Sequence, residues 1–457
     1  MKYVDLFSGC GGLSLGIEAS GAKLVLAVEK SDQASRSFRH NLVHDSSNDS
    51  EWKSYLDLPL ERQVEEKIVV SEVQAVLSNP TIMARLRRQK LDFVVGGPPC
   101  QGFSLAGRRE RDDVRNELPY QFLEFVEQTL PRMVVIENVL GMGQSFEKGT
   151  ESSFSQLRIA LSELGYEVQG VQANALHYGA PQHRPRLLLV GLKQEIAASK
   201  GIRATEHVWR SHFMGEHNAP LPALVPRPTL RSSDMRVLSD AVRDLTSFTE
   251  NRSPQSDYVL ELNRVFAPTI ARPDKGHKLS RNHVLRKHRP STVDRFRLYH
   301  FLKAAGLGER ILRQIADMDP KLSRLHIQNE IESNLTGVRA AFSLGLLPDY
   351  DEHSLVDLIE NSATRKHSQK VLSWHEPART VVTLPDDYIH PKEPRVFTVR
   401  ELARMQGFPD NFVFLGPETT GAHRRKFEVP QYSQVGNAVS PWLGLAIGQM
   451  IHGLLNQ

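Results

Sequence analysis

Short apolar runs alternate with amphipathic segments through residues 1–195, and this alternation narrows the possible folds more than any other feature of the chain. The runs have the length of buried strands, whereas the segments between them carry apolar residues at helical spacing. Such alternation predicts an α/β fold with a doubly wound parallel sheet and helices on both faces. The expected strands are Tyr3–Phe7, Leu24–Val28, Ile68–Val70, Phe93–Val95, Met133–Ile136 and Leu187–Val190, and the expected helices are Leu13–Ser20, Ser31–Leu42, Pro119–Leu130 and Phe154–Leu164.

The alternation is lost in the middle of the chain. From about 200 to 365 prolines, histidines and arginines are scattered, which predicts a smaller domain of irregular structure. Residues 434–457 are apolar and punctuated by glycine, so we expect them to pack back on the first domain. The predicted division is one domain of residues 1–198 and 430–457, and a second of residues 199–429 that includes a motif at 374–410.

Composition excludes several classes of protein. A chain of 457 residues with 40% hydrophobic and 24% charged residues has the composition of an ordinary soluble globular protein. Two cysteines are too few for a disulfide framework or a cysteine-rich zinc site, and no metal is expected. Neither a signal peptide nor a transmembrane run is recognisable, which predicts a cytoplasmic protein without a membrane partner. A net charge of +4 permits a nucleic-acid partner without requiring one.

One cysteine stands in an unusual setting. Cys100 follows Pro98 and Pro99 and precedes a Gly- and Ser-containing stretch, directly after the predicted strand Phe93–Val95. The two prolines fix the backbone and exclude ordinary helix or central strand. A thiol just past the carboxyl end of a strand lies where open α/β sheets bind ligands. The pattern therefore makes Cys100 a candidate nucleophile, although a lone cysteine is more often a small buried hydrophobe.

A glycine-rich loop follows the first predicted strand. The stretch Asp5–Gly16 leads into the first helix, and its glycines permit a tight turn against which a ligand can lie. Glu29 ends the second strand, where a carboxylate can hold ribose hydroxyls. The glycine spacing differs from the dinucleotide pattern. Together these features predict a cofactor that contains a nucleoside, and the alternative is a turn that serves packing alone.

Ionisable residues also end two later strands. Glu137 directly follows the predicted strand Met133–Ile136, so we expect it to face the same crevice at the carboxyl ends of the strands as Cys100. Partial burial there should raise the pKa of its carboxyl and let it share a proton with a ring nitrogen of a substrate. Strand alternation places Arg184 and Arg186 on one face, where two guanidiniums can hold a carboxylate and a carbonyl oxygen. The alternatives are a capping or ion-paired Glu137 and a solvated basic edge.

Together these segments resemble the C5-cytosine DNA methyltransferases. The match covers nearly the whole chain except its middle, and six segments follow the order of that family. They are Asp5–Gly16 for the cofactor loop, Gly97–Ser104 for the Pro-Cys segment, Glu137-Asn138-Val139, Gln182-x-Arg184-x-Arg186, Trp374–Thr383 with Arg379 and Thr380 followed by Phe397–Asp410, and Gln434–Pro441.

The resemblance implies a DNA (cytosine-5-)-methyltransferase with a Rossmann-like sheet that uses S-adenosylmethionine, together with a smaller, irregular DNA-recognition domain. Cys100 would attack C6 of a cytosine flipped out of double-stranded DNA, after which C5 takes the methyl group. Glu137 would hold or protonate N3. Arg186 would hold the O2 carbonyl and orient Glu137, and Arg184 would support it.

The resemblance also implies the cofactor contacts. Phe7 would stack on the adenine, Glu29 would bind the ribose hydroxyls, and Asn437 would close the pocket. The family's Gly-Asp-Ile-like element has its nearest match at Ser71-Glu72-Val73, so Glu72 would read the adenine with a longer side chain. The remaining expected cofactor contacts are Gly9, Gly11, Gly12 and Leu13, which would line the methionine moiety, and Pro98.

The variable middle corresponds to the family's target-recognition region, with residues 199–429 as the recognition domain. The stretch Ser280–Arg297 is basic and suited to phosphates, as are the arginines of the loop Gln101–Pro119. The resemblance further implies a monomeric modification enzyme of a restriction system, associated with the nucleoid, whose cognate endonuclease acts on the same site without binding it stably. The loop arginines are Arg108, Arg109, Arg111 and Arg115.

Two other functions remain open at this point. A tRNA or other RNA cytosine-5 methyltransferase shares the catalytic domain, but its branch carries a Cys-Phe-Thr element and a compact middle, which this sequence lacks. A catalytically silent DNA-binding relative would need none of Cys100, Glu137 and Arg186. Both alternatives are therefore less consistent with the residues present.

Overall fold

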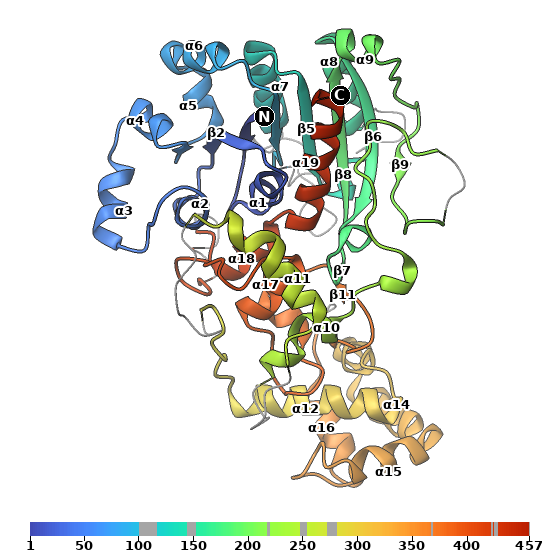
Figure 1. Cartoon of the computed structure of the whole chain (residues 1–457). Helices are drawn as coiled ribbons and strands as arrows, with labels where there is room; N and C mark the ends of the chain where they lie inside the picture. Colours follow the sequence, from blue (N-terminus) through green and yellow to red (C-terminus); the bar gives the residue numbers. More distant parts are fainter. Residues whose placement is uncertain are drawn as a thin grey trace. The chain divides into compact units, whose positions relative to one another are not determined.

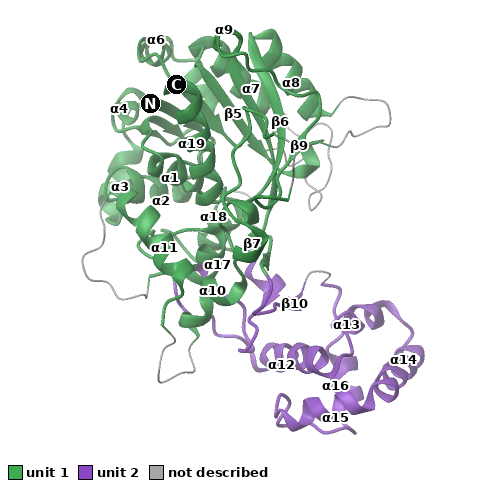
Figure 2. Cartoon of the chain, turned by 45° about the vertical axis from the view of Figure 1, so that its right-hand side comes forward, with its two compact units in different colours: residues 1–282, 377–383, 400–457 green, residues 283–376, 384–399 purple. Residues whose placement is uncertain are grey.

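The computed structural model describes residues 1–99, 117–143, 152–216, 220–246, 254–271, 281–366, 369–421, 424 and 428–456. The chain divides into two compact units. Unit 1 consists of residues 1–282, 377–383 and 400–457, and unit 2 of residues 283–376 and 384–399 (Figure 2).

The described part of unit 1 contains an eight-stranded sheet with the order β3-β2-β1-β4-β5-β8-β6-β9 (Figure 1). All six predicted strands are present. The first five pair in parallel, as the alternation predicted, but β8 is antiparallel to both β5 and β6. The strands are β1 (Lys2–Leu6), β2 (Lys23–Val28), β3 (Ile68–Val69), β4 (Phe93–Gly96), β5 (Met133–Asn138), β6 (Tyr166–Asn174), β8 (Pro185–Lys193) and β9 (Trp209–Arg210).

The antiparallel pairing follows from a short connection. Between β6 and β8 lie the 3-10 turn Ala175–Tyr178 and the short strand β7 (Gln182–His183), with no helix to carry the chain across the sheet. A parallel neighbour needs a crossover of a dozen or more residues, whereas an antiparallel neighbour needs only a short link. The prediction of a wholly parallel sheet was therefore wrong at this edge, and β6 was missed.

Helices cover both faces of the sheet, as predicted. One face packs on α7 (Leu118–Thr129) and α8 (Ser153–Glu163), and the other on α1 (Gly12–Ala19) (Figure 1). The side chain of Ser31 caps α2 (Asp32–Leu42), and that of Ser152 caps α8. Four further helices lie between β2 and β4: α3 (Asp49–Leu56), α4 (Leu60–Glu65), α5 (Val73–Leu77) and α6 (Pro80–Arg88).

The C-terminal segment returns to the first helix, as predicted. It forms α18 (Gln431–Asn437) and α19 (Pro441–Asn456), and α19 packs directly on α1. The approach is so close that a Cβ on Gly16 would lie 2.1 Å from the carbonyl oxygen of Pro441, and a Cβ on Gly444 would lie 2.7 Å from that of Leu13. Glycine at these positions allows the two helix backbones to touch.

Hydropathy sets α18 and α19 apart from the other helices. Across the described ranges no single helix has both the length and the apolar character for a bilayer span, and α18 with α19, bent by 41°, meet those two criteria only as a pair.

Unit 2 is mainly helical where it is described, whereas the sequence predicted irregular structure. Its longest helix, α12 (Pro290–Ala305), buries side chains over most of its circumference, including Phe296, Tyr299 and His300. A helix without a single apolar stripe lacks the periodic signal on which the prediction relied. The other elements are α13 (Ile311–Gln314), α14 (Pro320–Ser333), α15 (Leu335–Ser343), α16 (Leu355–Asn361), β10 (Lys370–Val371) and β12 (Tyr388–Ile389).

The compact units do not follow the predicted domain boundaries. Residues 199–282 and 400–429, which the sequence assigned to the second domain, belong to unit 1. They include α10 (Leu238–Val242), α11 (Asp257–Phe266) and most of α17 (Val399–Gln406). The fully buried Arg404 holds these segments together through Asp244 at 2.6 Å and Asp410 at 2.7 Å. The functional division into a catalytic and a recognition domain stays a prediction.

Candidate active site

Four predicted functional segments meet at the carboxyl edge of the parallel strands. The glycine loop follows β1, Glu29 follows β2, Gly97 and Pro98 follow β4, and Glu137 lies near the end of β5. Since β1 pairs with both β2 and β4, and β4 pairs with β5, these segments are neighbours. This edge is where open α/β sheets bind ligands.

Glu137 and Arg186 form a buried ion pair at this edge. The distance from Arg186 Nε to Glu137 Oε1 is 2.9 Å, and the two side chains are 13% and 10% exposed, respectively. Burial raises the pKa of Glu137 above its ordinary value, and the nearby guanidiniums of Arg186 and Arg184 oppose this rise. The carboxyl therefore holds a proton at a higher pH than an exposed glutamate does, while Arg186 fixes its orientation.

The segment that leads to position 100 lies against this pair. Asn138 Nδ2 donates to the carbonyl oxygen of Pro98 at 2.8 Å, and a Cβ on Gly97 would lie 3.0 Å from Glu137 Oε2. Asn138 thus anchors the backbone two residues before Cys100, a role that the sequence did not reveal. The sequence feature that could have identified Asn138 is its position directly after Glu137, a carboxylate near the end of a strand.

Several predicted residues lie outside the described part of the chain. They are Cys100, Arg108, Arg109, Arg111 and Arg115. The other cysteine, Cys10, is buried, and its pKa is raised to about 12 because burial disfavours the thiolate. Cys10 is therefore unsuited to nucleophilic attack.

The two predicted arginines have different partners. Arg186 pairs with Glu137, whereas the buried guanidinium of Arg184 donates to three main-chain carbonyl oxygens. These belong to Val381 at 2.9 Å, Gly436 at 2.7 Å and Ala438 at 3.0 Å. Arg184 thus fastens two C-terminal motifs to the start of β8, while the carboxylate contact is made by Arg186.

The glycine loop and Glu29 are joined by hydrogen bonds. Glu29 Oε2 accepts from the backbone of Gly9 at 3.0 Å, and Oε1 accepts from that of Ser31 at 2.7 Å. Phe7 adopts a φ of 58° and Gly11 a φ of 95°, both in the left-handed region, so the loop turns sharply between strand and helix. Burial raises the pKa of Glu29 above its ordinary value.

The other predicted cofactor residues lie in different settings. Phe7 is partly buried against the core, and Leu13 is buried in α1. A Cβ on Gly12 would lie 2.3 Å from the carbonyl oxygen of Val439, so this glycine permits the close approach of the C-terminal segment. Pro98 is buried, whereas Asn437 is exposed at the end of α18.

Glu72 is exposed just after β3. Its carboxylate lies 3.4 Å from Lys30 Nζ, and both side chains are well exposed. Lys30 directly follows Glu29, so this ion pair lies beside the strand end at which the ribose carboxylate was predicted.

Asp5 is a buried carboxyl that sequence reasoning did not single out. It lies in β1 beneath the glycine loop, and Ser14 Oγ donates to its Oδ2 at 2.6 Å. Burial raises its pKa to about 7, and the charge of Glu29 adds to this effect. The carboxyl thus ties β1 to α1 below the predicted cofactor site.

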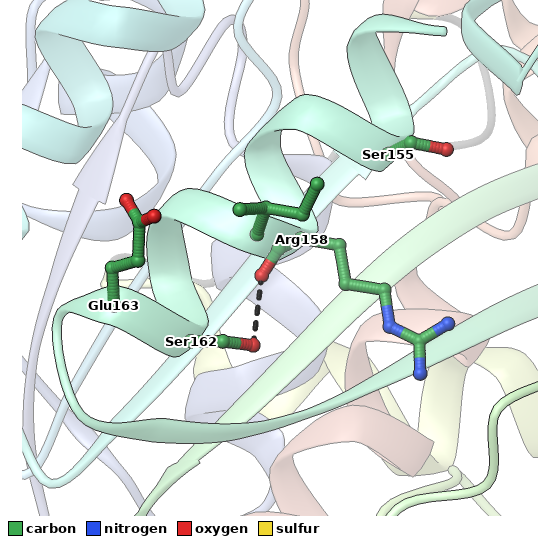
Figure 3. A pocket seen from close by; sticks show the side chains of 5 residues that line it. Ser155, Arg158, Ser162 and Glu163 are labelled. Atoms are coloured by element: carbon green, nitrogen blue, oxygen red, sulfur yellow. Dashed lines mark hydrogen bonds between the residues drawn. The ribbon is translucent and has the colours of Figure 1, made fainter. Parts of the chain in front are cut away.

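A cavity of about 560 Å³ lies along α8 and contains none of the predicted residues. It is lined by Ser155, Arg158, Ile159, Ser162 and Glu163 (Figure 3). Ser162 Oγ donates to the carbonyl oxygen of Arg158 at 3.0 Å, and the guanidinium of Arg158 donates to the carbonyls of Thr205 and Glu206. The Ser162 hydroxyl and the Arg158 guanidinium are therefore already bonded to main-chain carbonyl oxygens, and the cavity lies on the surface of α8.

Comparisons with known proteins agree with these motifs. The family model for C-5 cytosine-specific DNA methylase matches residues 1–453. The chain is 28% identical over 454 residues to type II methyltransferase M.DdeI of Desulfomicrobium norvegicum, covering 99% of this chain and 88% of that protein. It is 27% identical over 484 residues to type II methyltransferase M.AgeI of Thalassovita gelatinovora, covering 99% of each.

A solved structure has a similar fold. It is a putative DNA modification methyltransferase encoded within a prophage of E. coli, with a TM-score of 0.58 at 22% identity over the full length of both chains. Among the described residues, no group of three or more His, Cys, Asp or Glu side chains is placed to hold a metal ion.

Proposed function

Because the chain belongs to the C-5 cytosine-specific DNA methylase family, we propose that it methylates C5 of a cytosine flipped out of double-stranded DNA, with Cys100 as the nucleophile. The family makes the chain a DNA cytosine-5 methyltransferase. The use of S-adenosylmethionine, the covalent step and the roles of individual residues are what we propose beyond this enzyme class.

The covalent step makes C5 nucleophilic. The Cys100 thiolate adds to C6 and forms a carbon–sulfur bond, which breaks the aromaticity of the ring and leaves C5 as an enamine carbon. C5 then takes a methyl group. Loss of the C5 proton to a base and expulsion of the thiolate restore the aromatic ring and the free cysteine. The target carbons lie inside the duplex, so the base must first leave the stack.

The Glu137–Arg186 pair would activate the ring. A carboxyl whose pKa is raised by burial can share a proton with N3, which draws electrons from C6. Arg186 would hold the O2 carbonyl while its Nε keeps Glu137 in place. Asn138 would position the thiol by anchoring Pro98.

The loop after β1 is the proposed binding site for S-adenosylmethionine. The loop turns sharply through the left-handed region, and the Glu29 carboxylate lies at the end of the neighbouring strand, where it can bind the ribose hydroxyls of a nucleoside. Phe7 would stack on the adenine, Glu29 would hold the ribose and Gly9 and Gly11 would border the methionine moiety. Leu13, Gly12, Pro98, Glu72 and Asn437 remain proposed contacts. When bound, S-adenosylmethionine would supply the methyl group from its sulfonium and would leave as S-adenosylhomocysteine.

The strongest support for the proposal is the set of contacts around Glu137. The buried Glu137–Arg186 pair, the Asn138–Pro98 hydrogen bond and the close approach of Gly97 to Glu137 bring together three motifs, which follow one another in the sequence at intervals of roughly forty to fifty residues. A protein that only bound DNA would gain nothing from a buried ion pair next to a Pro-Pro-Cys segment, because such a pair is costly to desolvate.

The test is bisulfite sequencing of DNA from cells that express the protein, beside cells that express Cys100→Ser. We expect protected cytosines in one recurrent sequence context with the wild-type protein and none with the variant, whose DNA binding should be largely kept. Protection by Cys100→Ser would contradict the proposed nucleophile. Unprotected DNA with folded wild-type protein would favour RNA methylation or silent DNA binding.

The biological setting is also proposed. The names of the relatives support a modification enzyme of a type II restriction system. We expect a cytoplasmic monomer whose partner is double-stranded DNA, and a restriction endonuclease that acts on the same site without stable binding. If this holds, DNA from expressing cells resists an endonuclease of the matching sequence, and DNA from Cys100→Ser cells is cut.

A further inference from the structure

Unit 2 contains a cavity with a cationic lining. The cavity measures about 350 Å³ and combines the segment before α12, the first turns of α12, Lys366 with Gln369 before β10, and Asp386 before β12. Five lysines and arginines line it against a single carboxylate: Arg286, Lys287, Arg289, Arg295 and Lys366 against Asp386. Every lining residue belongs to unit 2. We refer to it as the cationic pocket.

The single carboxylate neutralises only part of this charge. Asp386 lies 3.1 Å from a terminal guanidinium nitrogen of Arg286 and 3.9 Å from Lys366 Nζ. Within the described residues, Lys287, Arg289 and Arg295 have no carboxylate partner within ion-pair distance. Lys287 and Arg289 are exposed and Arg295 is half-buried, so three positive charges border one small cavity without a carboxylate to balance them, and such a cluster attracts anions.

Two further features favour an anion. Arg295 is half-buried in the lining, and among the described residues its Nε meets no hydrogen-bond acceptor, so this nitrogen is not engaged by the protein. Helix α12 begins at Pro290, its N-cap residue Arg289 makes no side-chain cap, and the positive end of the helix dipole lies beside the same cavity. His288 adds no charge at neutral pH, because burial and Arg286 lower its pKa.

We propose that the cationic pocket of unit 2 binds a backbone phosphate of the DNA substrate. This inference rests on the proposed function, which makes double-stranded DNA the partner. Guanidinium and ammonium groups are the usual ligands of DNA phosphates, and such contacts position the protein on the duplex without reading its sequence. The pocket would therefore hold the DNA in register for other residues to read.

The experiment compares two triple variants of the full-length protein. The pocket variant is Lys287→Gln/Arg289→Gln/Arg295→Gln. The control variant is Arg310→Gln/Arg313→Gln/Lys321→Gln, which removes the same charge from exposed positions of unit 2 outside the cavity. Binding of a short mixed-sequence DNA duplex is measured by fluorescence anisotropy at several salt concentrations. Lys287→Gln alone is added because its exposed side chain can be replaced without disturbing the fold.

The pocket variant should bind DNA at least about tenfold more weakly than the wild type, since it loses charge-assisted hydrogen bonds. Its plot of log affinity against log salt should be shallower by about one, as for one lost phosphate contact. Lys287→Gln should shift both in the same direction, and the control should change little. Equal affinities and slopes for pocket and control variants would overturn the inference.

Other probes separate this inference from its rivals. A larger loss with duplex RNA than with DNA would overturn the assignment to DNA, and so would loss of inorganic phosphate binding with DNA binding unchanged. The methylation assay tests the proposed function independently. A wild-type protein that methylates DNA while the pocket variant binds normally refutes only the pocket. A wild-type protein that shows the pocket-dependent salt slope without methylating refutes only the proposed function.

Discussion

The ion pair between Glu137 and Arg186 gives the clearest prediction at the scale of single residues. Glu137→Gln cannot deliver a proton, and Arg186→Gln cannot hold the carboxyl in place. We expect each to slow methyl transfer by about a hundredfold to ten-thousandfold, the range for a lost general acid. Because the pair acts as a unit, the double variant should be little slower than either single one. Single-turnover rates with saturating DNA and cofactor measure this.

Binding measurements control that experiment. The affinity of each variant for S-adenosylmethionine should stay near that of the wild type, because Glu137 is proposed to contact cytosine and not the cofactor. Losses that simply multiply in the double variant would show that the two residues act independently.

Asp5 gives a prediction about pH. Burial raises its pKa to about 7, above the value of about 4 in an unfolded chain. The folded protein therefore binds this proton more tightly, and wild-type stability falls as the pH rises from about 4 to about 7. Asp5→Asn lacks this carboxyl, so its free energy of unfolding should exceed the wild type's at pH 7 by up to about 4 kcal/mol, with no excess near pH 4. Urea unfolding at several pH values measures it, and parallel curves for the two proteins would refute it.

At the scale of elements, the contact between α1 and α19 depends on glycine. A Cβ on Gly444 would lie 2.7 Å from the carbonyl oxygen of Leu13, and helix backbone cannot easily move away. Gly444→Ala should therefore lower the free energy of unfolding by about 1–3 kcal/mol. Gly453→Ala in the same helix is the matched control, since its Cβ would meet nothing within 4 Å, and it should gain up to about 1 kcal/mol from helix propensity. Equal effects of the two changes in chemical denaturation would argue against the close helix contact.

At the scale of the whole molecule, each unit has its own core. Leu302 is fully buried in the core of unit 2, and the residues of that core include none from the eight-stranded sheet. Leu302→Ala should cost about 2–5 kcal/mol of stability in unit 2. We expect calorimetry to show an earlier transition for unit 2 and the variant to lose DNA affinity, while S-adenosylmethionine still binds. If Leu302→Ala lost S-adenosylmethionine binding at a temperature where its far-UV circular dichroism is unchanged, the independence of the two cores would be contradicted.

The sequence by itself determined six of the eight strands of the large sheet and the helices α1, α2, α7 and α8, because these depend on hydrophobic periodicity and local capping. It also placed Glu29 and Glu137 at strand ends. It determined neither the helical character of unit 2, where α12 lacks an apolar stripe, nor the antiparallel turn at β8.

Only the tertiary structure decided which side chains became partners. Arg184 and Arg186 are two residues apart and looked equivalent, yet one binds the backbone of distant motifs and the other binds Glu137. Asn138 and Asp5 acquire their roles from Pro98 and Ser14, which local sequence does not identify. The periodicity of a chain sets the elements that it forms, whereas ion pairs, burial and raised pKa values arise only when packing brings residues far apart in sequence into contact.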